Sequence, residues 1–264
     1  MKQGPERSHP AFFYTDSAAG PVVPVRGNRH MSPSGRSGRA EFVHQMFDAI
    51  AGHYDLMNRL ISLGRDRAWR RHVVRLASLG PGARLLDVGT GTGDILMTVQ
   101  SCQRGVRMVG LDFTLNMMRV GRLRNGGRRI LWCAGDALCL PFPDESFDAV
   151  TSAYLIRNVT DARRAFQEQM RVVRPGGKVV CLDTSPPRTG LLRPLVLFHL
   201  EVVIPFLGYL LTRQNAAYRY LPSSTRAFVP PEQLASIMQS AGLENVRYRS
   251  LMFGTQAVHV GTRR

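Results

Sequence analysis

The stretch LLDVGTGTGD, residues 85–94, decides the fold of this chain. An apolar run ends in Asp87, glycines follow at positions 89, 91 and 93, and a helical pattern begins near Asp94. Glycine adopts positive φ angles at little cost and lets a backbone approach a ligand closely. Ligands of doubly wound sheets bind at the carboxyl ends of such strands. The stretch therefore predicts a ligand-binding turn between a buried strand and a helix.

Short strand-like runs alternate with helical patterns on both sides of this turn. Strands are predicted at 83–89, 106–113, 129–136, 147–156 and 177–185. Helical patterns at 94–102, 114–123 and 161–173 follow most of them, and a helix at 230–242 precedes two closing strands at 244–253 and 255–263. The alternation predicts an α/β fold with a mainly parallel seven-stranded sheet and helices on both faces.

The ends of the pattern set the domain organisation. Residues 1–39 are rich in Pro, Gly, Ser and Arg and predict a disordered tail, within which Met31 is a candidate natural start. Residues 40–264 are interpreted as one domain with a helical N-terminal cover at 40–80. The apolar stretch 191–211 is long enough to span a bilayer, but it contains charged residues and two prolines. A lid over an apolar site, within 190–221, is the better prediction.

Charge and cysteine content restrict the partners. The net charge is +16, yet 33 of the 35 basic residues are arginines and they form no long block. This skew is typical of a GC-rich genome, so we expect no nucleic-acid partner, while an anionic membrane surface stays open. Cys102, Cys133, Cys139 and Cys181 lack metal-binding spacing and predict reduced core cysteines, no metal and a cytoplasmic protein. The first 40 residues show no secretory signal.

Asp94 bears on which cofactor the glycine turn would bind. Dinucleotide-binding turns follow GxGxxG, but Asp94 stands at the third glycine position. An acid at a helix start competes with a pyrophosphate for the positive helix end. A sulfonium ligand that carries an amino group tolerates an acid there. The turn therefore favours S-adenosylmethionine over NAD.

Two further predicted strands end in acids. Asp112 can accept hydrogen bonds from both ribose hydroxyls, and Asp136 with Ala137 can contact the adenine edge. Each acid taken singly is better explained as a helix cap or turn residue. Together with Asp87, Gly89 and Gly91 they predict one cofactor site along the sheet edge.

These motifs and several others resemble a known family. The stretches are YDLMNRLISLGRDRAWRR (54–71), DVGTGTGD (87–94), GDALCLPFPDESFD (135–148), RNVTD (157–161), VVRPGGKVVCLDTS (172–185), AYRYLPSS (217–224) and AVHVGTRR (257–264). With them, residues 41–264 resemble the ubiquinone/menaquinone biosynthesis C-methyltransferases, which belong to the class I, Rossmann-like methyltransferases. GTGTGD and RPGGK are common to many methyltransferases, whereas the motifs at 54–64, 157–161 and 218–224 are more specific to this family.

The resemblance implies an activity and assigns residues to it. It implies methyl transfer from S-adenosylmethionine to a ring carbon of a prenylated quinol, with demethylmenaquinol favoured. The family's cofactor contacts fall on Thr92, Asp112, Asp136 and Ala137. Its YDxMN motif falls on Tyr54, Asp55 and Asn58, and its RN pair falls on Arg157-Asn158. Of these, Tyr54, Arg157 and Asn158 are the expected catalytic residues, and Asp87, Gly89 and Gly91 complete the expected cofactor site.

Two departures leave the substrate ring open. Tyr154-Leu155 replaces the family's usual Phe-Gly, and Asp183-Thr184 stands where Glu-Phe is common. Both pairs are expected near the substrate pocket. The alternative reaction is methylation of a ubiquinone, plastoquinone or tocopherol precursor. Two alternative functions also stay open: a non-catalytic scaffold of a quinone-synthesis complex, and an RNA methyltransferase.

Arg157-Asn158 fits the chemistry that the resemblance implies. Ring-carbon methylation needs a phenolate, and a phenol titrates near 10, so the site must stabilise its anion. Arg157 does not deprotonate, but it can hold a phenolate or polarise a water, and Asn158 can orient the oxygen. The structural alternative is a strand-end cap with an ion pair to Asp161, and Tyr54 could be a core aromatic. His53, His199 and His259 are more simply structural.

The implied substrate suggests where the protein works. A polyprenyl tail predicts peripheral contact with the membrane surface, on its inner face, which the apolar 191–211 stretch and the arginine-rich surface suit. The sequence leaves the oligomeric state open, and a homodimer is one state that it permits.

Overall fold

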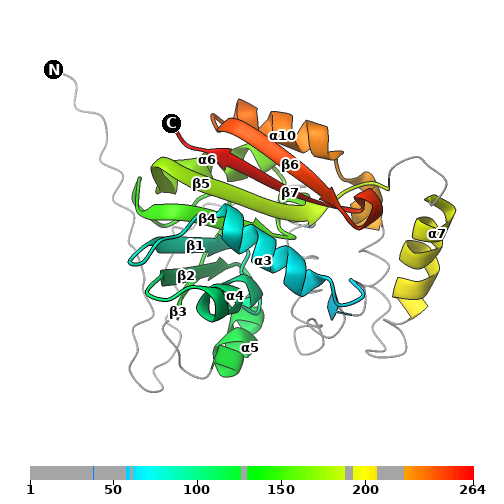
Figure 1. Cartoon of the computed structure of the whole chain (residues 1–264), viewed down its shortest axis with the longest axis horizontal. Coiled ribbons are helices and arrows are strands. Elements are labelled where there is room, and N and C mark those ends of the chain that lie inside the picture. Colours follow the sequence, from blue (N-terminus) through cyan, green and yellow to red (C-terminus); the bar gives the residue numbers. More distant parts are fainter. Residues whose placement is uncertain (1–37, 39–57, 60–61, 126–129, 188–192, 207–222) are drawn as a thin grey trace.

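A seven-stranded sheet forms the centre of the protein (Figure 1). The computed structural model describes residues 38, 58–59, 62–125, 130–187, 193–206 and 223–264. The sheet has the strand order β3-β2-β1-β4-β5-β7-β6. Its strands are β1 (Arg84–Val88), β2 (Arg107–Asp112), β3 (Ile130–Ala134), β4 (Phe147–Ala153), β5 (Val173–Thr184), β6 (Glu244–Leu251) and β7 (Gln256–Thr262). The predicted α/β fold and its seven strands are confirmed.

The pairing of the strands places the candidate site. β3, β2, β1, β4 and β5 run parallel, and β7 is antiparallel to both β5 and β6. The order of the strands reverses direction at β1, whose neighbours are β2 and β4. The carboxyl ends of β1, β2, β3 and β4 therefore meet at one edge of the sheet, at the switch point where ligands of open α/β sheets bind.

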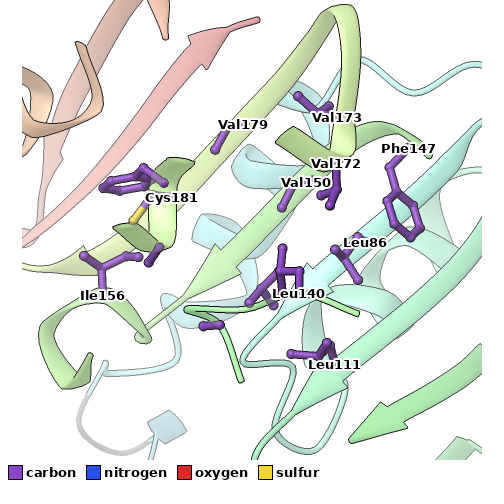
Figure 2. Packing of buried hydrophobic residues seen from close by; sticks show 14 of the residues in the cluster. Leu86, Leu111, Leu140, Phe147, Val150, Ile156, Val172, Val173, Val179 and Cys181 are labelled. Carbon is purple, nitrogen blue, oxygen red and sulfur yellow. The ribbon is translucent and has the colours of Figure 1, made fainter. Parts of the chain in front are cut away.

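Helices cover both faces of the sheet. One face carries α3 (Asp66–Leu76), α4 (Asp94–Cys102) and α5 (Leu115–Asn125), and the other carries α6 (Ala162–Val172) and α10 (Pro231–Ser240). The alternation of β1 shows the division: Leu85 packs with the α3 and α4 residues, whereas Leu86 packs with those of α6 and α10. Figure 2 shows the second cluster, where Leu86, Val150, Val172 and Val179 converge.

The helices begin and end at recognisable signals. Gly93, at φ 82°, is the N-cap of α4, and the carboxylate of Asp161 caps α6 by accepting the Arg164 N–H at 2.9 Å. α10 starts with Pro231, whose missing N–H costs nothing in the first turn. These ends agree closely with the sequence prediction because capping is local chemistry.

Two strand boundaries differ from the prediction. The apolar run 147–156 was expected to stay in the sheet, but β4 ends at Ala153 and a 3₁₀ turn, η1 (Ile156–Asn158), follows. Tyr154 adopts φ 60°, which turns the chain out of the sheet. β5 begins earlier than expected, at Val173, because the pairing with β4 shifts register between Phe147 and Ala149.

The segment from Arg193 to Phe206 is helical throughout. It comprises α7 (Arg193–Phe198), the π-helical turn η2 (His199–Val203) and a last turn at 204–206. Within the described residues, no helix has both the length and the apolar character that a bilayer crossing requires. Parts of the predicted segments lie outside the described residues. They are residues 1–37 and 39 of the tail, residues 40–57 and 60–61 of the cover, and residues 190–192 and 207–221 of the lid.

Candidate active site

The glycine turn has the geometry that its sequence predicts. Gly89, Gly91 and Gly93 adopt φ angles of 68°, 55° and 82°, in the left-handed region. A β carbon at position 93 would lie 2.6 Å from Cη2 of Trp132, and one at position 89 would lie 2.9 Å from Cδ1 of Leu155. Both the backbone conformation and the close packing therefore require glycine.

Asp87, near the end of β1, is hydrogen-bonded to the glycine turn. Its carboxylate oxygens accept hydrogen bonds from the Thr151 hydroxyl at 2.7 Å and the Thr90 hydroxyl at 2.8 Å, and the residue is 2% exposed. Burial raises the pKa of the Asp87 carboxyl to about 7, although these two hydrogen bonds oppose the shift. The carboxylate thus fixes the end of β1 to the loop that follows. Contact between Asp87 and the cofactor stays a prediction.

Asp112 connects the end of β2 to the same turn. Its carboxylate accepts the backbone N–H groups of Gly91 and Thr114, each at 2.7 Å. Burial raises the pKa of the Asp112 carboxyl, and these hydrogen bonds act in the opposite direction. Phe113, the next residue, is an aromatic residue that is 58% exposed.

The end of β3 supplies a third acid at the same edge of the sheet. Asp136 is exposed and its carboxylate accepts the Leu138 N–H at 2.9 Å, while Ala137 is buried. Thr92, within the glycine turn, is also buried. The predicted contacts at β1, β2 and β3 therefore lie along one edge, as the sequence indicated.

Asp94 is used differently from what its position suggested. Its carboxylate forms ion pairs with Arg70 of α3 at 2.7 Å and with Arg124 of α5 at 3.1 Å. Arg70 also bonds Asp66 at 2.6 Å, so the chain Asp66–Arg70–Asp94–Arg124 ties α3, α4 and α5 together. The two arginines neutralise the acid at the helix start. The charge of Asp94 is therefore satisfied without an amino group from a ligand.

An apolar cavity of about 410 Å³ opens beside the glycine turn. Residues from α3 and the preceding turn, the end of β4, segment 193–206 and the turn between β6 and β7 line it. Most of its surface is apolar, and its polar lining residues are Asn58, Ser62, Asp66, Arg157, Thr184, His199, Thr225, Thr255 and Gln256. Segment 193–206 contributes to the lining, and its action as a lid stays a prediction.

Tyr154 and Leu155 join this cavity to the glycine turn. Tyr154 lines the cavity, and the side chain of Leu155 packs against Gly89. The Tyr154 N–H donates to the Leu182 carbonyl at 2.7 Å, which fixes the chain at the point where it leaves the sheet. Adjacent residues thus contact the two halves of the candidate site.

Arg157 is a buried cavity residue held by an acid from the next strand. Its Nη1 donates to Oδ1 of Asp183 at 2.7 Å, and its backbone N–H donates to Oδ2 of Asp183 at 3.2 Å. The two side chains are 3% and 1% exposed. The guanidinium carbon lies 5.3 Å from the centroid of the Tyr154 ring. The alternative of an ion pair with Asp161 is wrong, because Asp161 caps α6 and Asp183 binds the arginine.

Asn158 follows at the end of the 3₁₀ turn. Its amide nitrogen donates to the Tyr154 carbonyl at 3.0 Å, so it stabilises the turn that presents Arg157. Tyr54, the third predicted catalytic residue, lies outside the described residues, and its role stays a prediction.

Sequence reasoning passed over two acids of this site. Asp183 was noted only as a departure from the family pattern, and Asp66 was not singled out. A signal for Asp183 was available in the sequence. This acid lies at the end of the predicted strand 177–185, and the predicted strand 147–156 leads directly to Arg157. Asp66 gave no such signal, because it belongs to a helix far along the chain from the strand ends.

The structure agrees with the structural role predicted for His259 and with two of the four predicted core cysteines. His259 is buried in β7, its Nε2 lies 2.9 Å from the Pro231 carbonyl, and burial lowers its pKa, which agrees with a structural role. Cys133 and Cys181 are core residues as expected, but Cys102 and Cys139 are exposed. The prediction of four core cysteines is therefore wrong for two of them.

Comparison with known proteins identifies the family. Residues 35–263 match the model of the ubiE/COQ5 methyltransferase family. The chain belongs to this family. It is 46% identical over 226 residues to a demethylmenaquinone methyltransferase of Roseiflexus castenholzii, with 86% of this chain and 95% of that protein covered. It is 44% identical over 220 residues to a demethylmenaquinone methyltransferase of Thermus thermophilus, with 83% of this chain and 100% of that protein covered.

A further relative carries the broader name. A ubiquinone/menaquinone biosynthesis C-methyltransferase of Desulfotalea psychrophila is 44% identical over 222 residues, with 84% of this chain and 90% of that protein covered. Among solved structures, a Thermotoga maritima SAM-dependent methyltransferase superposes with a TM-score of 0.59 at 20% identity, covering 84% of this chain and 99% of that one. The structural similarity confirms the class I methyltransferase fold, and family membership confirms that the protein is a methyltransferase.

Proposed function

We propose that this enzyme transfers a methyl group from S-adenosylmethionine to a ring carbon of a prenylated quinol, converting demethylmenaquinol to menaquinol. The observation that carries the proposal is the apolar cavity of about 410 Å³ beside the glycine turn, with Arg157 in its lining. The names of the Roseiflexus and Thermus relatives support this choice of ring. The proposed enzyme is cytoplasmic and takes its substrate from the membrane.

The residues at the strand ends suit S-adenosylmethionine. The glycine turn offers backbone at close range, Asp112 is oriented by two N–H donors at 2.7 Å, and Asp136 and Ala137 stand one strand further on. Phe113 places an exposed ring where it can stack on adenine. The bound cofactor supplies an electrophilic methyl group. The described residues orient it by the ribose, the adenine and the turn.

Arg157 is the residue we assign to the phenolate. A phenol with a pKa near 10 must lose its proton before its ortho carbon becomes nucleophilic. The guanidinium favours the anion by charge and by hydrogen bonding, most strongly in a site that excludes water. Asp183 fixes the guanidinium in advance, so no reorientation is needed when the anion forms. Asp183 is thus a positioning residue rather than a catalytic one.

Two groups of the described lining can accept the phenol proton. Asp66 lines the cavity, is 4% exposed, and accepts a hydrogen bond from the Ser62 hydroxyl at 3.2 Å. His199 also lines the cavity, on the π-helical turn η2. Substituting each by a neutral isostere, Asp66→Asn and His199→Gln, and recording the pH dependence of kcat distinguishes them. The acceptor is the residue whose loss removes the acidic limb.

The ring identity depends on the cavity residues in which this chain departs from its family. Tyr154 and Thr184 both line the cavity. Each is more polar than the phenylalanine that the family usually carries at that position. A ubiquinone, plastoquinone or tocopherol precursor remains the alternative substrate. Mass spectrometry of quinones in a deletion strain tests the assignment: demethylmenaquinone should accumulate, and an unaltered menaquinone pool would overturn it.

The alternative of a catalytically silent scaffold has its own test. A scaffold has no need to bind S-adenosylmethionine, so isothermal calorimetry with the purified protein separates the two functions. We expect micromolar binding, lowered by Asp112→Ala. An RNA methyltransferase would instead bind RNA with a steep dependence on salt.

A further inference from the structure

The outer side of segment 193–206 carries large apolar side chains in contact with water. Leu195, Phe198, Val202 and Phe206 follow one another at intervals of three and four residues, so they share one face of the helix. They are 65%, 56%, 49% and 62% exposed. A surface helix of a water-soluble protein ordinarily turns charged and polar residues outward.

The inner side of the same segment is apolar as well. Val196, Val203 and Ile204 line the cavity, and Ile204 is 2% exposed. A helix that is apolar on two sides is well solvated only if one side packs on protein and the other meets an apolar environment. Water is therefore a poor solvent for the outer face.

Two turns add apolar side chains at the same end of the molecule. Leu63, before α3, and Phe253, in the 3₁₀ turn η3 (Met252–Gly254) between β6 and β7, are 69% and 68% exposed, and both line the cavity. Their φ angles are 52° and 54°, a region that bulky residues rarely adopt. Figure 1 shows α7, the start of α3 and the turn between β6 and β7 together at the right-hand end.

These exposed side chains surround the opening of the cavity. We define the apolar mouth as Leu63, Leu195, Phe198, Val202, Phe206 and Phe253. Leu63, Leu195, Phe198 and Phe253 belong both to the exposed surface and to the cavity lining. The apolar surface is thus continuous from the cavity to the outside.

Arginines flank the apolar mouth. Arg59, Arg65 and Arg67 are exposed around Leu63, and Arg193 is exposed two residues before Leu195. The whole chain carries a net charge of +16. Basic side chains beside an apolar surface are attracted to anionic lipid headgroups, and the attraction falls off within a Debye length.

We propose that the apolar mouth docks onto a bilayer that contains anionic phospholipid, so that the cavity opens into the lipid. Leu63, Phe253 and the outer face of segment 193–206 enter the headgroup region, and the flanking arginines meet the phosphates. This inference rests on the proposed function, because a prenylated quinol resides in the bilayer and its tail would leave the cavity through this mouth. The quinol ring then reaches Arg157 without crossing water.

Vesicle co-sedimentation tests the docking surface. Val202 and Phe206 are suitable positions because they belong to the mouth but not to the cavity lining. Wild-type protein should sediment with phosphatidylglycerol-containing vesicles and much less with pure phosphatidylcholine. Val202→Asp/Phe206→Asp should bind the anionic vesicles at least about tenfold more weakly.

Leu123 provides the matched control. It is 84% exposed on α5, away from the mouth, so Leu123→Asp adds a charge at an exposed leucine and should bind as the wild type does. Arg65→Glu/Arg67→Glu should weaken binding to anionic vesicles only. Equal binding by the double aspartate variant overturns the proposal. So does a mouth-dependent dimer that binds no vesicles, which would make this face an interface between two copies.

Activity separates this inference from the proposed function. Val202→Asp/Phe206→Asp should methylate a short-tailed, water-soluble quinol at the wild-type rate, yet lose turnover on a long-tailed quinol in vesicles. If wild-type protein binds vesicles but methylates no quinol, the proposed function fails and the docking surface stands. If the wild type and Val202→Asp/Phe206→Asp methylate the long-tailed quinol in vesicles equally well, the docking surface fails and the proposed function stands.

Discussion

The two halves of the candidate site hold their charged residues in different ways. On the proposed cofactor side, Asp112 is fixed by the backbone N–H groups of Gly91 and Thr114. On the proposed quinol side, Arg157 is fixed by the carboxylate of Asp183, and both are almost completely buried. Backbone donors come with the turn itself, whereas an ion pair needs a second side chain from another strand. The quinol side should therefore be the more fragile half.

The largest effect is expected from breaking the ion pair. Asp183→Ala removes the carboxylate that binds the buried guanidinium of Arg157, which should lower the free energy of unfolding by about 3–5 kcal/mol. Asp144, whose side chain is 69% exposed and pairs with Arg171, is the control: Asp144→Ala should cost less than about 1 kcal/mol. Urea denaturation measures both. Similar losses in the two variants would contradict the comparison.

Replacing both members of the pair separates stability from catalysis. Arg157→Met/Asp183→Leu should recover much of the stability, because apolar residues can replace a buried ion pair. The same variant should lose about a hundredfold or more in kcat while its affinity for the cofactor stays near that of the wild type. Retained turnover would return Arg157 to a structural role.

The glycine turn should be sensitive to a single methyl group. Gly93→Ala places a β carbon 2.6 Å from the Trp132 ring at a residue whose φ is 82°. It should lower the free energy of unfolding by about 2–4 kcal/mol. Gly176 has a φ of 77° with nothing within 4 Å of an added β carbon. Gly176→Ala should therefore cost only the backbone strain, about 1 kcal/mol. Thermal unfolding compares the two, and equal shifts would mean that packing at Gly93 is unimportant.

Removal of the strand-end acid should affect binding more than folding. If Asp112 binds the ribose as proposed, Asp112→Ala removes charge-assisted hydrogen bonds, so affinity for S-adenosylmethionine should fall about 10–100-fold. Asp136→Ala, at an exposed position, should have the smaller effect. Calorimetry gives both affinities, with circular dichroism to verify the fold. Unchanged affinity in Asp112→Ala would remove the ribose assignment.

The stability of the protein should also depend on pH through Asp87. The pKa of Asp87 is raised by burial to about 7, so the folded protein binds a proton that the unfolded chain releases near 3.8. Its contribution to stability is complete below about pH 3.8 and is lost as the pH rises through about 7. Asp87→Asn should therefore lower the dependence of stability on pH between about 4 and 7. An unchanged dependence would show that the carboxyl titrates normally.

Local patterns predicted most of the fold. Strand-like runs, the three glycines and the caps of α4, α6 and α10 depend on residues a few positions apart, and the structure agrees with them. Where the prediction was wrong, long-range contacts decided. β4 ends at Ala153 because Tyr154 adopts a φ of 60° beside Leu182 of β5, and β5 starts early because its register with β4 shifts.

The candidate site divides along the same line. Asp87, Asp112 and Asp136 each follow an apolar run, so their common edge could be deduced from strand order alone. The partner of Arg157 could not, because Asp183 stands 26 residues away and Asp161 was the nearer acid. Choosing between two acids requires the positions of β4 and β5 in space.

The sequence by itself determined the α/β fold, the glycine turn and the family, because these depend on local chemistry and on motifs of fixed spacing. Only the tertiary structure decided what surrounds Arg157 and what the apolar segment faces. Segment 193–206 is apolar on both sides, and a pattern of hydrophobicity cannot say which side packs on protein. The cavity beneath it and the exposed side chains above it settle that division, because burial is a property of the folded chain.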